Sequence, residues 1–348
     1  MVYPSLTIVH VGHFPTGLKT SWHYSIQIKI SNGLTRLGHL VLNFSDRDVA
    51  RARSLLKNRK LGRGAVNAAL ISFCQHHRPD VVLLGHADMI NPETLVTIRA
   101  ILPNVRIGQW NADPLFEPDN VRRIQSKVNV VNATFITTAG APLERMRHGG
   151  HAMSFIPNPV DPSVERGRAD LVQNPAYDLF YACGNPRSPL RTICGTPWDM
   201  DRFMTRLSQK LPQVRMKLAG LLGHAHLTSA AYIDSVASSA IGLNVSRRAD
   251  NFLYSSDRIA QLAGNGSLVA IERETGYGTY FGEDEMLFFS SLEELDEKLA
   301  CLISDPQKRM RMAAAGRKRY FARFNERAVA AHIVAVLMQE CRPEDMPW

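Results

Sequence analysis

The sequence has few of the features that mark several common protein classes. Its five cysteines lie scattered among 348 residues and never in C-x-x-C spacing, which argues against a zinc ribbon and for free thiols in a reducing compartment. No apolar run approaches the roughly 18–20 residues that span a bilayer. The first residues lead directly into a strand-like segment, with neither a basic region nor a cleavage site, so we expect no signal peptide. These absences predict a cytoplasmic protein.

The usual nucleotide- and metal-binding motifs are also missing. No Walker A string is present, and the glycine-bearing turn at 12–17 is not G-x-G-x-x-G, so a classical NAD site is only weakly supported. Residues 46–48 and 199–201 form D-x-D strings, which in other proteins hold Mg²⁺ or Mn²⁺ against phosphates. The second string falls at a helix start, where acidic residues are favoured in any case. We expect neither a metal nor a bound cofactor.

Charge is the clearest compositional signal. There are 41 Lys and Arg against 32 Asp and Glu, a net charge of +9, with 45% apolar and 21% charged residues. This composition is globular, and the basic excess predicts a polyanionic neighbour: a phosphorylated substrate, an acidic lipid surface or nucleic acid. The basic residues gather at 47–63 and 308–327. These clusters are candidates for a peripheral membrane patch, with solvated helix faces as the alternative.

Short apolar runs alternate with amphipathic stretches in the first half of the chain. Runs rich in Val, Ile and Leu suit strands that are buried on both faces of a parallel sheet. The alternation predicts a doubly wound, Rossmann-like α/β domain over residues 1–165. Its strands are expected at 6–12, 39–44, 80–86, 106–110, 132–138 and 153–157, and its helices near 22–37, 65–78 and 92–102.

A polar stretch that ends near Pro175 predicts a linker, and a second Rossmann-like domain is expected over 176–325. Apolar residues at helical spacing in 326–348 predict a helix that packs back on the first domain. Such folds bind ligands outside the carboxyl ends of their strands, so we expect the site in a cleft between the domains. Strands are expected at 178–183, 215–219, 240–245, 268–271 and 286–289, and helices near 199–210, 228–238, 256–263, 292–303 and 306–321.

Two residues of the first domain are candidates for proton transfer. Gly12 and His13 follow the first strand, where a glycine lets the backbone approach a ligand and the histidine would act as a general base. Asp113 follows the fourth strand and precedes a proline, which is a good position from which to accept a proton from an acceptor hydroxyl. A backbone-bonded loop histidine and a capping turn aspartate are the structural alternatives.

Candidate phosphate-binding residues follow the strands of the second domain. Gly184 and Asn185 end its first strand and present backbone N–H groups, and Arg187 adds charge. An ordinary surface turn is the alternative there.

The richest segment begins at Asn244, at the end of a buried strand. A loop with Tyr254 then enters a helix with Ser255 or Ser256 at its N-cap, where free N–H groups would attract a diphosphate. Arg258 lies on the first turn and Gln261 shares its face. A capped helix with a solvated arginine is the structural alternative.

These segments resemble GT-B glycosyltransferases, and the second half resembles the CgeB-like group of the family 1/4-type enzymes. Trp110 with Asp113-Pro114 fits the first half of that group. The pieces that match over 177–325 are Gly184-Asn185, Leu243-Asn244, Arg258, Leu262-Ala263, Gly266, Gly282, 292–295, Asp305-Pro306, Arg309 and 315–317.

The resemblance implies metal-independent transfer of a sugar from a nucleotide-diphosphate sugar to a hydroxyl acceptor. The second domain would hold the donor and the first the acceptor. Gln261 departs from the family, which usually has Glu at this position near the donor ribose, and the E-x7-E pair is absent because Leu253 stands eight residues earlier. Cell-surface polysaccharide or lipopolysaccharide synthesis at the inner membrane face is the expected setting.

Two other classes of function remain open. A sugar-nucleotide epimerase with a GT-B-like fold would turn over the donor without any acceptor. A polyanion-binding module that has lost catalysis would bind nucleic acid or lipid in a salt-dependent way and would have no affinity for nucleotide-sugars.

Overall fold

The computed structural model describes residues 4–14, 23–54, 58–147, 149–184 and 190–348. The chain divides into two compact units. The first comprises residues 1–159 with 326–347, and the second comprises 160–325 with Trp348. The boundary therefore lies at Pro159–Val160, earlier than the expected 165. Residues 160–175 are part of the second unit and are not a linker.

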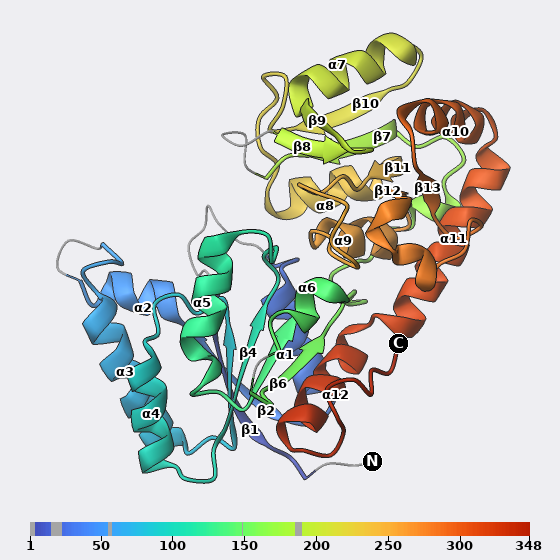
Figure 1. Cartoon of the computed structure of the whole chain (residues 1–348). Coiled ribbons are helices and arrows are strands. Elements are labelled where there is room, and N and C mark those ends of the chain that lie inside the picture. Colours follow the sequence, from blue (N-terminus) through green and yellow to red (C-terminus); the bar gives the residue numbers. More distant parts are fainter. Residues whose placement is uncertain (1–3, 15–22, 55–57, 148, 185–189) are drawn as a thin grey trace. The chain divides into compact units, whose positions relative to one another are not determined.

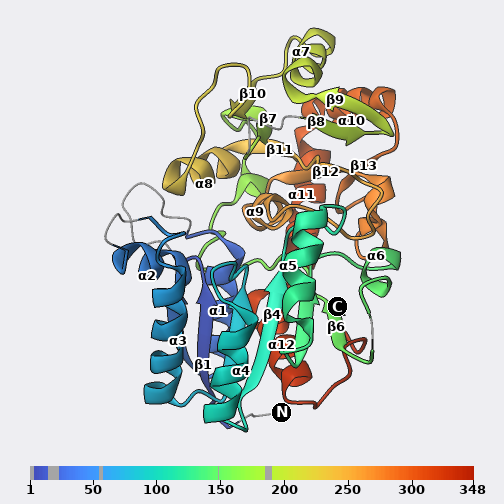
Figure 2. The same cartoon turned by 60° about the vertical axis from the view of Figure 1, so that its left-hand side comes forward.

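The first unit contains a six-stranded, wholly parallel sheet in the order β2-β1-β3-β4-β5-β6. Every residue of β3 is buried, as expected for a strand that is covered on both faces. Figures 1 and 2 show α1 and α12 on one face and α3, α4 and α5 on the other. The strands are β1 (Thr7–Gly12), β2 (Leu40–Ser45), β3 (Val81–Gly85), β4 (Arg106–Asn111), β5 (Ala133–Ile136) and β6 (Ala152–Phe155).

The helices of the first unit are α1 (Ile26–Arg36), α2 (Asp46–Ala52), α3 (Arg63–His77), α4 (Pro92–Ile101), α5 (Pro118–Val128), α6 (Ala141–Glu144) and α12 (Glu326–Leu337). The final helix α12 packs along α1. Gly33 makes this close approach feasible, because a Cβ at this position would lie 2.1 Å from the Glu326 carbonyl oxygen. Arg36 adds an ion pair to the Glu326 carboxylate at 2.6 Å.

The second unit has a five-stranded parallel sheet in the order β10-β7-β11-β12-β13, plus an antiparallel hairpin of β8 and β9. Its strands are β7 (Tyr177–Ala182), β8 (Leu190–Ile193), β9 (Thr196–Asp199), β10 (Met216–Ala219), β11 (Ser239–Leu243), β12 (Leu268–Glu272) and β13 (Leu287–Phe289). The helices are α7 (Met200–Lys210), α8 (Ser229–Ala237), α9 (Arg258–Gly264), α10 (Leu292–Ser304) and α11 (Pro306–Arg323), with 3₁₀ turns at Ala169–Leu171, Arg273–Thr275 and Tyr277–Thr279.

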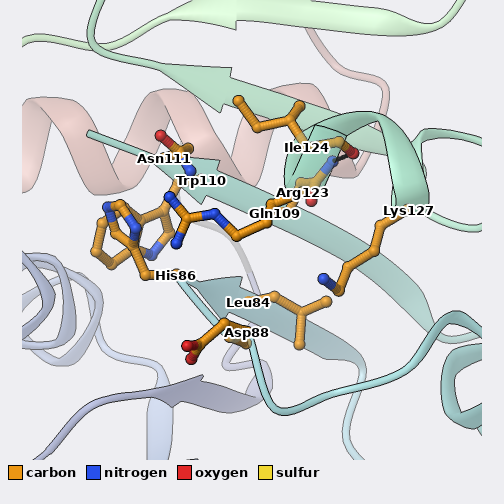
Figure 3. Close-up of a pocket in the computed structure, with 10 residues that line it drawn as sticks. Leu84, His86, Asp88, Gln109, Trp110, Asn111, Arg123, Ile124 and Lys127 are labelled. Atoms are coloured by element: carbon orange, nitrogen blue, oxygen red, sulfur yellow. Dashed lines mark hydrogen bonds between the residues drawn. The ribbon is translucent and has the colours of Figure 1, made fainter. Parts of the chain in front are cut away.

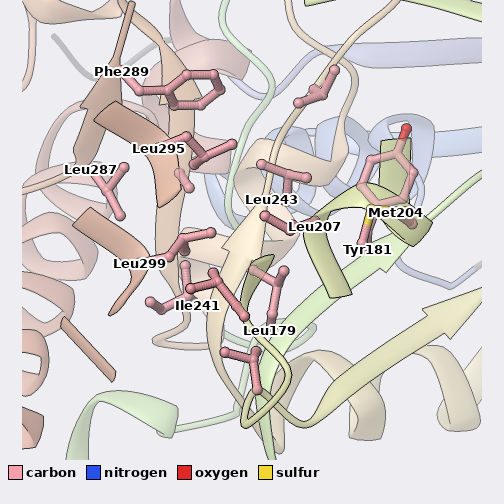
Figure 4. Packing of buried hydrophobic residues seen from close by; sticks show 14 of the residues in the cluster. Leu179, Tyr181, Met204, Leu207, Ile241, Leu243, Leu287, Phe289, Leu295 and Leu299 are labelled. Carbon is pink, nitrogen blue, oxygen red and sulfur yellow. The ribbon is translucent and has the colours of Figure 1, made fainter. Parts of the chain in front are cut away.

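The apolar core of the second unit lies between this sheet and the helices α7 and α10. Leu179 and Ile241 from β7 and β11 meet Leu207 of α7 and Leu299 of α10 (Figure 4). On the other face, α9 packs against β12 and is buried along its whole length. Gly242 allows this, since a Cβ there would lie 2.2 Å from a Leu262 methyl carbon. The packing brings the start of α9 to the carboxyl ends of the strands.

Candidate active site

A buried arginine joins the carboxyl ends of β7 and β11. Arg258 is 8% exposed and donates from Nη1 to the Ala182 carbonyl and from Nη2 to the Val245 carbonyl at 2.8 Å. Its Nε lies 3.5 Å from Asn244 Oδ1, and its guanidinium stacks 4.7 Å from the centre of the Tyr181 ring. An arginine has five N–H donors, so two of those on Arg258 have no partner among the residues described.

The serines predicted to cap the next helix have other partners. The Ser255 hydroxyl accepts a bond from Asn244 Nδ2 at 2.8 Å and donates to the Ser256 carbonyl at 3.0 Å. The Ser256 N–H donates to Ser246 Oγ at 3.2 Å. The N-cap residue is Asp257, which makes no side-chain cap bond. The prediction of a cap at Ser255 or Ser256 was therefore wrong by one or two residues.

The first turn of α9 also differs from what the sequence suggested. The N–H groups of Ile259 and Ala260 donate to the carbonyls of Ser256 and Asp257 at 3.2 and 3.1 Å. These tight i to i−3 bonds occupy donors that an α-helix usually leaves open at its N-terminus. The N–H groups of Ile259 and Ala260 are therefore not available to a diphosphate, which leaves fewer free N–H groups at this helix start than the sequence suggested.

Gln261, at the position where the resembled family has Glu, is held by two neighbours. It is 2% exposed. The Tyr232 hydroxyl donates to its Oε1 at 2.6 Å, and its Nε2 donates to Asp257 Oδ2 at 3.1 Å. The site therefore uses both halves of the amide, one as acceptor and one as donor. A carboxylate would make only the first of these contacts.

The structure describes only some of the remaining residues that were predicted for the donor site. Tyr254 is buried in the loop that precedes α9. Gly184 is exposed just after β7, and a Cβ there would meet nothing within 4 Å. Asn185 and Arg187 fall outside the residues that the structure describes. The predicted strand-end turn is therefore characterised only at Gly184.

Sequence reasoning missed an acid at the same edge of the second sheet. Glu272 ends β12 and is buried, and burial raises its pKa to about 7. Its Oε2 accepts a hydrogen bond from the Cys194 N–H at 2.6 Å. This bond joins the β8–β9 turn to the end of β12. Cys194 and Gly195 both have positive φ, so the Cys-Gly pair at a hairpin turn was the available sequence signal.

In the first unit, Gly12 is the last residue of β1 and His13 follows it. A Cβ on Gly12 would lie 3.1 Å from the Gly85 carbonyl oxygen, so the glycine serves a close approach between β1 and β3. His13 is half-buried. Its burial and, to a smaller extent, the positive charge of Arg47 lower the pKa of its imidazole. The ring is therefore neutral at pH 7 and able to accept a proton. The backbone carbonyl of His13 accepts from Gln27 Nε2 at 2.8 Å.

Asp113 lies beyond β4 and contacts a histidine and an arginine. Its Oδ2 is 3.4 Å from His86 Nδ1 and 3.0 Å from Arg123 Nη2. His86 has φ of 47°, and its Nε2 accepts the Ala112 N–H at 3.1 Å, so the neutral ring carries its proton on Nδ1, towards Asp113. Desolvation lowers the pKa of His86 and keeps it neutral. The Oδ1 atom of Asp113 has no partner among the described residues. Within the described ranges, no interaction joins Asp113 to His13.

A narrow pocket opens beside these groups at the carboxyl ends of β3 and β4 (Figure 3). Arg123 and Lys127 extend into it from α5, Arg123 towards His86 and Trp110, and Lys127 towards Leu84. Sequence reasoning missed both cations, because α5 was not predicted. The pocket is lined by Leu84, His86, Ala87, Asp88, Gln109, Trp110, Asn111, Arg123, Ile124 and Lys127.

The two D-x-D strings have separate structural roles. Asp46 is fully buried at the start of α2, and burial together with the nearby Asp88 raises its pKa to about 6. Asp199 caps α7 by accepting the N–H groups of Asp201 and Arg202. Over the described ranges, no group of three or more His, Cys, Asp or Glu side chains is arranged to hold a metal ion.

The basic clusters are partly used within each unit. Arg309 donates to the Val172 and Gln173 carbonyls, Arg317 to Gly264, and Arg319 to Tyr280. In the other cluster, Arg47 pairs with Asp88 and Arg51 with Asp48. The exposed members include Arg53, Lys60, Lys308, Arg311, Lys318 and Arg327. No helix in the described part of the chain is both long and apolar enough to cross a membrane.

Solved structures similar to this chain establish its fold. Anabaena Alr3699/HepE, determined with UDP and glucose, matches with a TM-score of 0.57 and 13% identity over 96% of this chain and 100% of that one. A Rickettsia africae glycosyltransferase matches with a TM-score of 0.59 and 11% identity, over 97% and 99%. The α,α-trehalose-6-phosphate synthase of Burkholderia multivorans matches with a TM-score of 0.60 and 11% identity, over 97% and 99%. The predicted GT-B fold is confirmed.

A family model described as "Glycosyl transferase-like" matches residues 191–335. This match falls on the half of the chain in which the sequence motifs carried the resemblance, and the resemblance to GT-B glycosyltransferases is confirmed. A search of curated protein sequences found no match. Family model and fold together favour a glycosyltransferase over an epimerase or a binding module.

Proposed function

We propose that this protein transfers a sugar from a nucleotide-diphosphate sugar to a hydroxyl of an acceptor. The observation that carries the proposal is Arg258, a buried cation at the carboxyl edge of the second sheet with two N–H donors that no described residue uses. Ligands of Rossmann-like domains bind at this edge. The family match over 191–335 and the fold shared with UDP-bound HepE support a nucleotide-sugar donor.

The chemistry asks two things of the protein. The bond from the anomeric carbon to the diphosphate breaks, and the leaving oxygen takes up negative charge, which a preorganised guanidinium stabilises. The acceptor hydroxyl loses its proton as its oxygen bonds to the anomeric carbon. Asp113 Oδ1 is our first candidate to take that proton, because His86 and Arg123 both hold Oδ2. His13, neutral at pH 7, is the second.

Donor binding is tested by a thermal-shift screen against UDP, GDP, ADP, CMP, dTDP and their common sugars, with and without EDTA. A ligand at 100 times its Kd stabilises a fold by about 2.7 kcal/mol. We expect one nucleoside diphosphate to shift the melting temperature, and EDTA to leave that shift intact. Failure of every nucleotide to shift it would contradict the proposal.

The role of Arg258 has a matched control in the same unit. Arg317 also donates to a backbone carbonyl, Gly264 at 2.9 Å, and lies 4.6 Å from the centre of the Phe321 ring. We expect Arg258→Lys to lose about 2–4 kcal/mol of transition-state stabilisation, and Arg317→Lys to keep the wild-type rate. Equal turnover of the two variants would refute the assignment.

The acceptor side is tested by pH profiles of Asp113→Asn and His13→Asn. Loss of the acidic limb of kcat/KM in only one variant identifies the base.

For the biological setting we propose cell-surface polysaccharide or lipopolysaccharide synthesis at the inner membrane face. The exposed basic residues at 47–63 and 308–327 support attraction to anionic lipid. Co-sedimentation with phosphatidylglycerol vesicles at two salt concentrations tests the membrane contact. Binding that is absent at low salt would refute it.

A further inference from the structure

The pocket in the first unit contains a buried cation that none of the described residues pairs directly. Lys127 is 7% exposed, and its Nζ makes no hydrogen bond or ion pair with any residue in the described ranges. A buried ammonium is costly unless it is paired. Burial lowers the pKa of Lys127, which is the physical sign of that cost.

The acids around Lys127 are already engaged. Asp88, the carboxylate in the lining, accepts Arg47 at 3.2 Å. Asp113 accepts Arg123 at 3.0 Å. Asp46, whose charge also reaches Lys127, accepts the Arg47 N–H at 2.8 Å. Each of these carboxylates therefore has a donor on one of its oxygens, and Lys127 bonds none of them, although the charges of Asp88 and Asp46 offset part of the cost of its burial.

The neutral polar groups of the lining are engaged as well. Gln109 Nε2 donates to the Ile124 carbonyl at 3.1 Å and to Thr134 Oγ1 at 3.0 Å. Asn111 exchanges hydrogen bonds with Asn120 at 2.8 and 3.1 Å. The lining therefore has a fixed shape, and the ammonium is its available charged donor.

The size of the pocket limits what enters. The cavity is about 20 Å³, room for one water-sized atom. A single oxygen of a phosphate or carboxylate fits, and the rest of the anion would remain at the mouth. The Arg123 side chain, 41% exposed, is placed to meet it there.

We propose that this pocket binds one oxygen of an anionic group on the acceptor, a phosphate monoester or a carboxylate, through Lys127 inside and Arg123 at the mouth. Identifying the anion's carrier as the acceptor rests on the proposed function, whereas the anion site rests on the first unit alone. Arg123 contacts both Asp113 and the pocket, so the bound anion would lie close to the candidate base.

The test is a titration of the full chain with inorganic phosphate, and separately with acetate, followed by backbone amide shifts in two-dimensional NMR. Sodium chloride at matched ionic strength is the reference. We expect phosphate or acetate to shift the amides of 86–89 and 109–111. Lys127→Met should weaken the binding of the preferred anion at least about tenfold, and Lys127→Arg should retain most of the affinity. Lys210→Met, at an exposed lysine of α7, should match the wild type.

The outcomes separate cleanly. A preference for phosphate indicates a phosphorylated acceptor, and a preference for acetate indicates a carboxylated one. Equal affinity in Lys127→Met, or equal shifts from chloride alone, would overturn the proposal. Nucleotide binding is read in the same spectra from the amides of 244–261, so failure of the donor site and failure of the anion site are distinguished. Spectral dispersion of Lys127→Met shows whether the variant is folded.

Discussion

The Gln261→Glu substitution tests why an amide stands where the resembled family carries a carboxylate. In the native chain Gln261 Nε2 donates to Asp257 Oδ2 at 3.1 Å. A glutamate would place its own carboxylate oxygen against Asp257 Oδ2, at a position that is 2% exposed. Burial and a like charge both raise a carboxyl pKa. A rise of about 2 units corresponds to about 2.7 kcal/mol of lost stability.

The pH dependence of the loss has a definite sign. An unfolded glutamate has a pKa of about 4.3, and the folded value in the variant is raised above it. Below about pH 4 the side chain is protonated in both states, and the carboxyl donates to Asp257 as the amide did. As the pH rises above the unfolded pKa, the unfolded state releases its proton before the folded state does. The stability of the variant therefore falls until the pH has passed the raised folded pKa. The deficit relative to wild type is complete near pH 7–8.

The assay is urea unfolding of both proteins at pH 4.5, 6 and 8. Gln125→Glu, at an exposed position of α5, is the control for adding a carboxylate and should show no comparable deficit. Tyr232→Phe in the Gln261→Glu background removes the hydroxyl that bonds Oε1 at 2.6 Å and should deepen the deficit. A Gln261→Glu variant as stable as wild type at pH 8, or one that gains stability with rising pH, would refute the reasoning.

Three further substitutions have defined outcomes. Lys127→Met should stabilise the fold by about 1–2 kcal/mol in thermal melts, because it removes an unpaired buried charge; a lower melting temperature would mean that the ammonium is satisfied. Glu272, with a pKa of about 7 against its ordinary 4.5, should cost the wild type up to about 3 kcal/mol as the pH rises from 4.5 past 7. Glu272→Gln should flatten that dependence in urea titrations. Gly33→Val should cost at least about 2 kcal/mol by overpacking against α12, and Gly64→Val, where a Cβ would meet nothing within 4 Å, should cost much less in the same assay.

The parallel strands could be predicted because burial on both faces leaves a direct record in the sequence. Residues 81–85 read VVLLG and are buried throughout, and the predicted strand at 80–86 differs by one residue at each end. The elements that were missed leave a weaker record. The three branched apolar residues of α5, at positions 121, 124 and 128, stand at helical spacing, but its other eight residues are polar or proline and the spacing was not recognised. The β8–β9 hairpin is short, and its Cys-Gly turn was not recognised.

The candidate site was predictable in outline, and its details were not. Strand ends at Gly12, Asp113 and Asn244 follow from the alternation, because parallel strands deliver their last residues to one edge. The partners of those residues come from elsewhere in the chain. Arg123 reaches Asp113 from a helix ten residues later, and Tyr232 reaches Gln261 from α8. No local pattern specifies such contacts, since they depend on how helices pack on the sheet.

Arg258 shows why a structural role and a catalytic role are difficult to separate at this edge. Its bonds to the Ala182 and Val245 carbonyls join β7 to β11, so its removal leaves two buried carbonyls without a donor and destabilises the unit. The same bonds fix the guanidinium and spare it reorganisation when a charge develops nearby. Loss of activity in an Arg258 variant is therefore informative only beside its nucleotide affinity. A folded variant that still binds the nucleoside diphosphate but cleaves the bond between sugar and diphosphate slowly would show that the charge acts on the transition state.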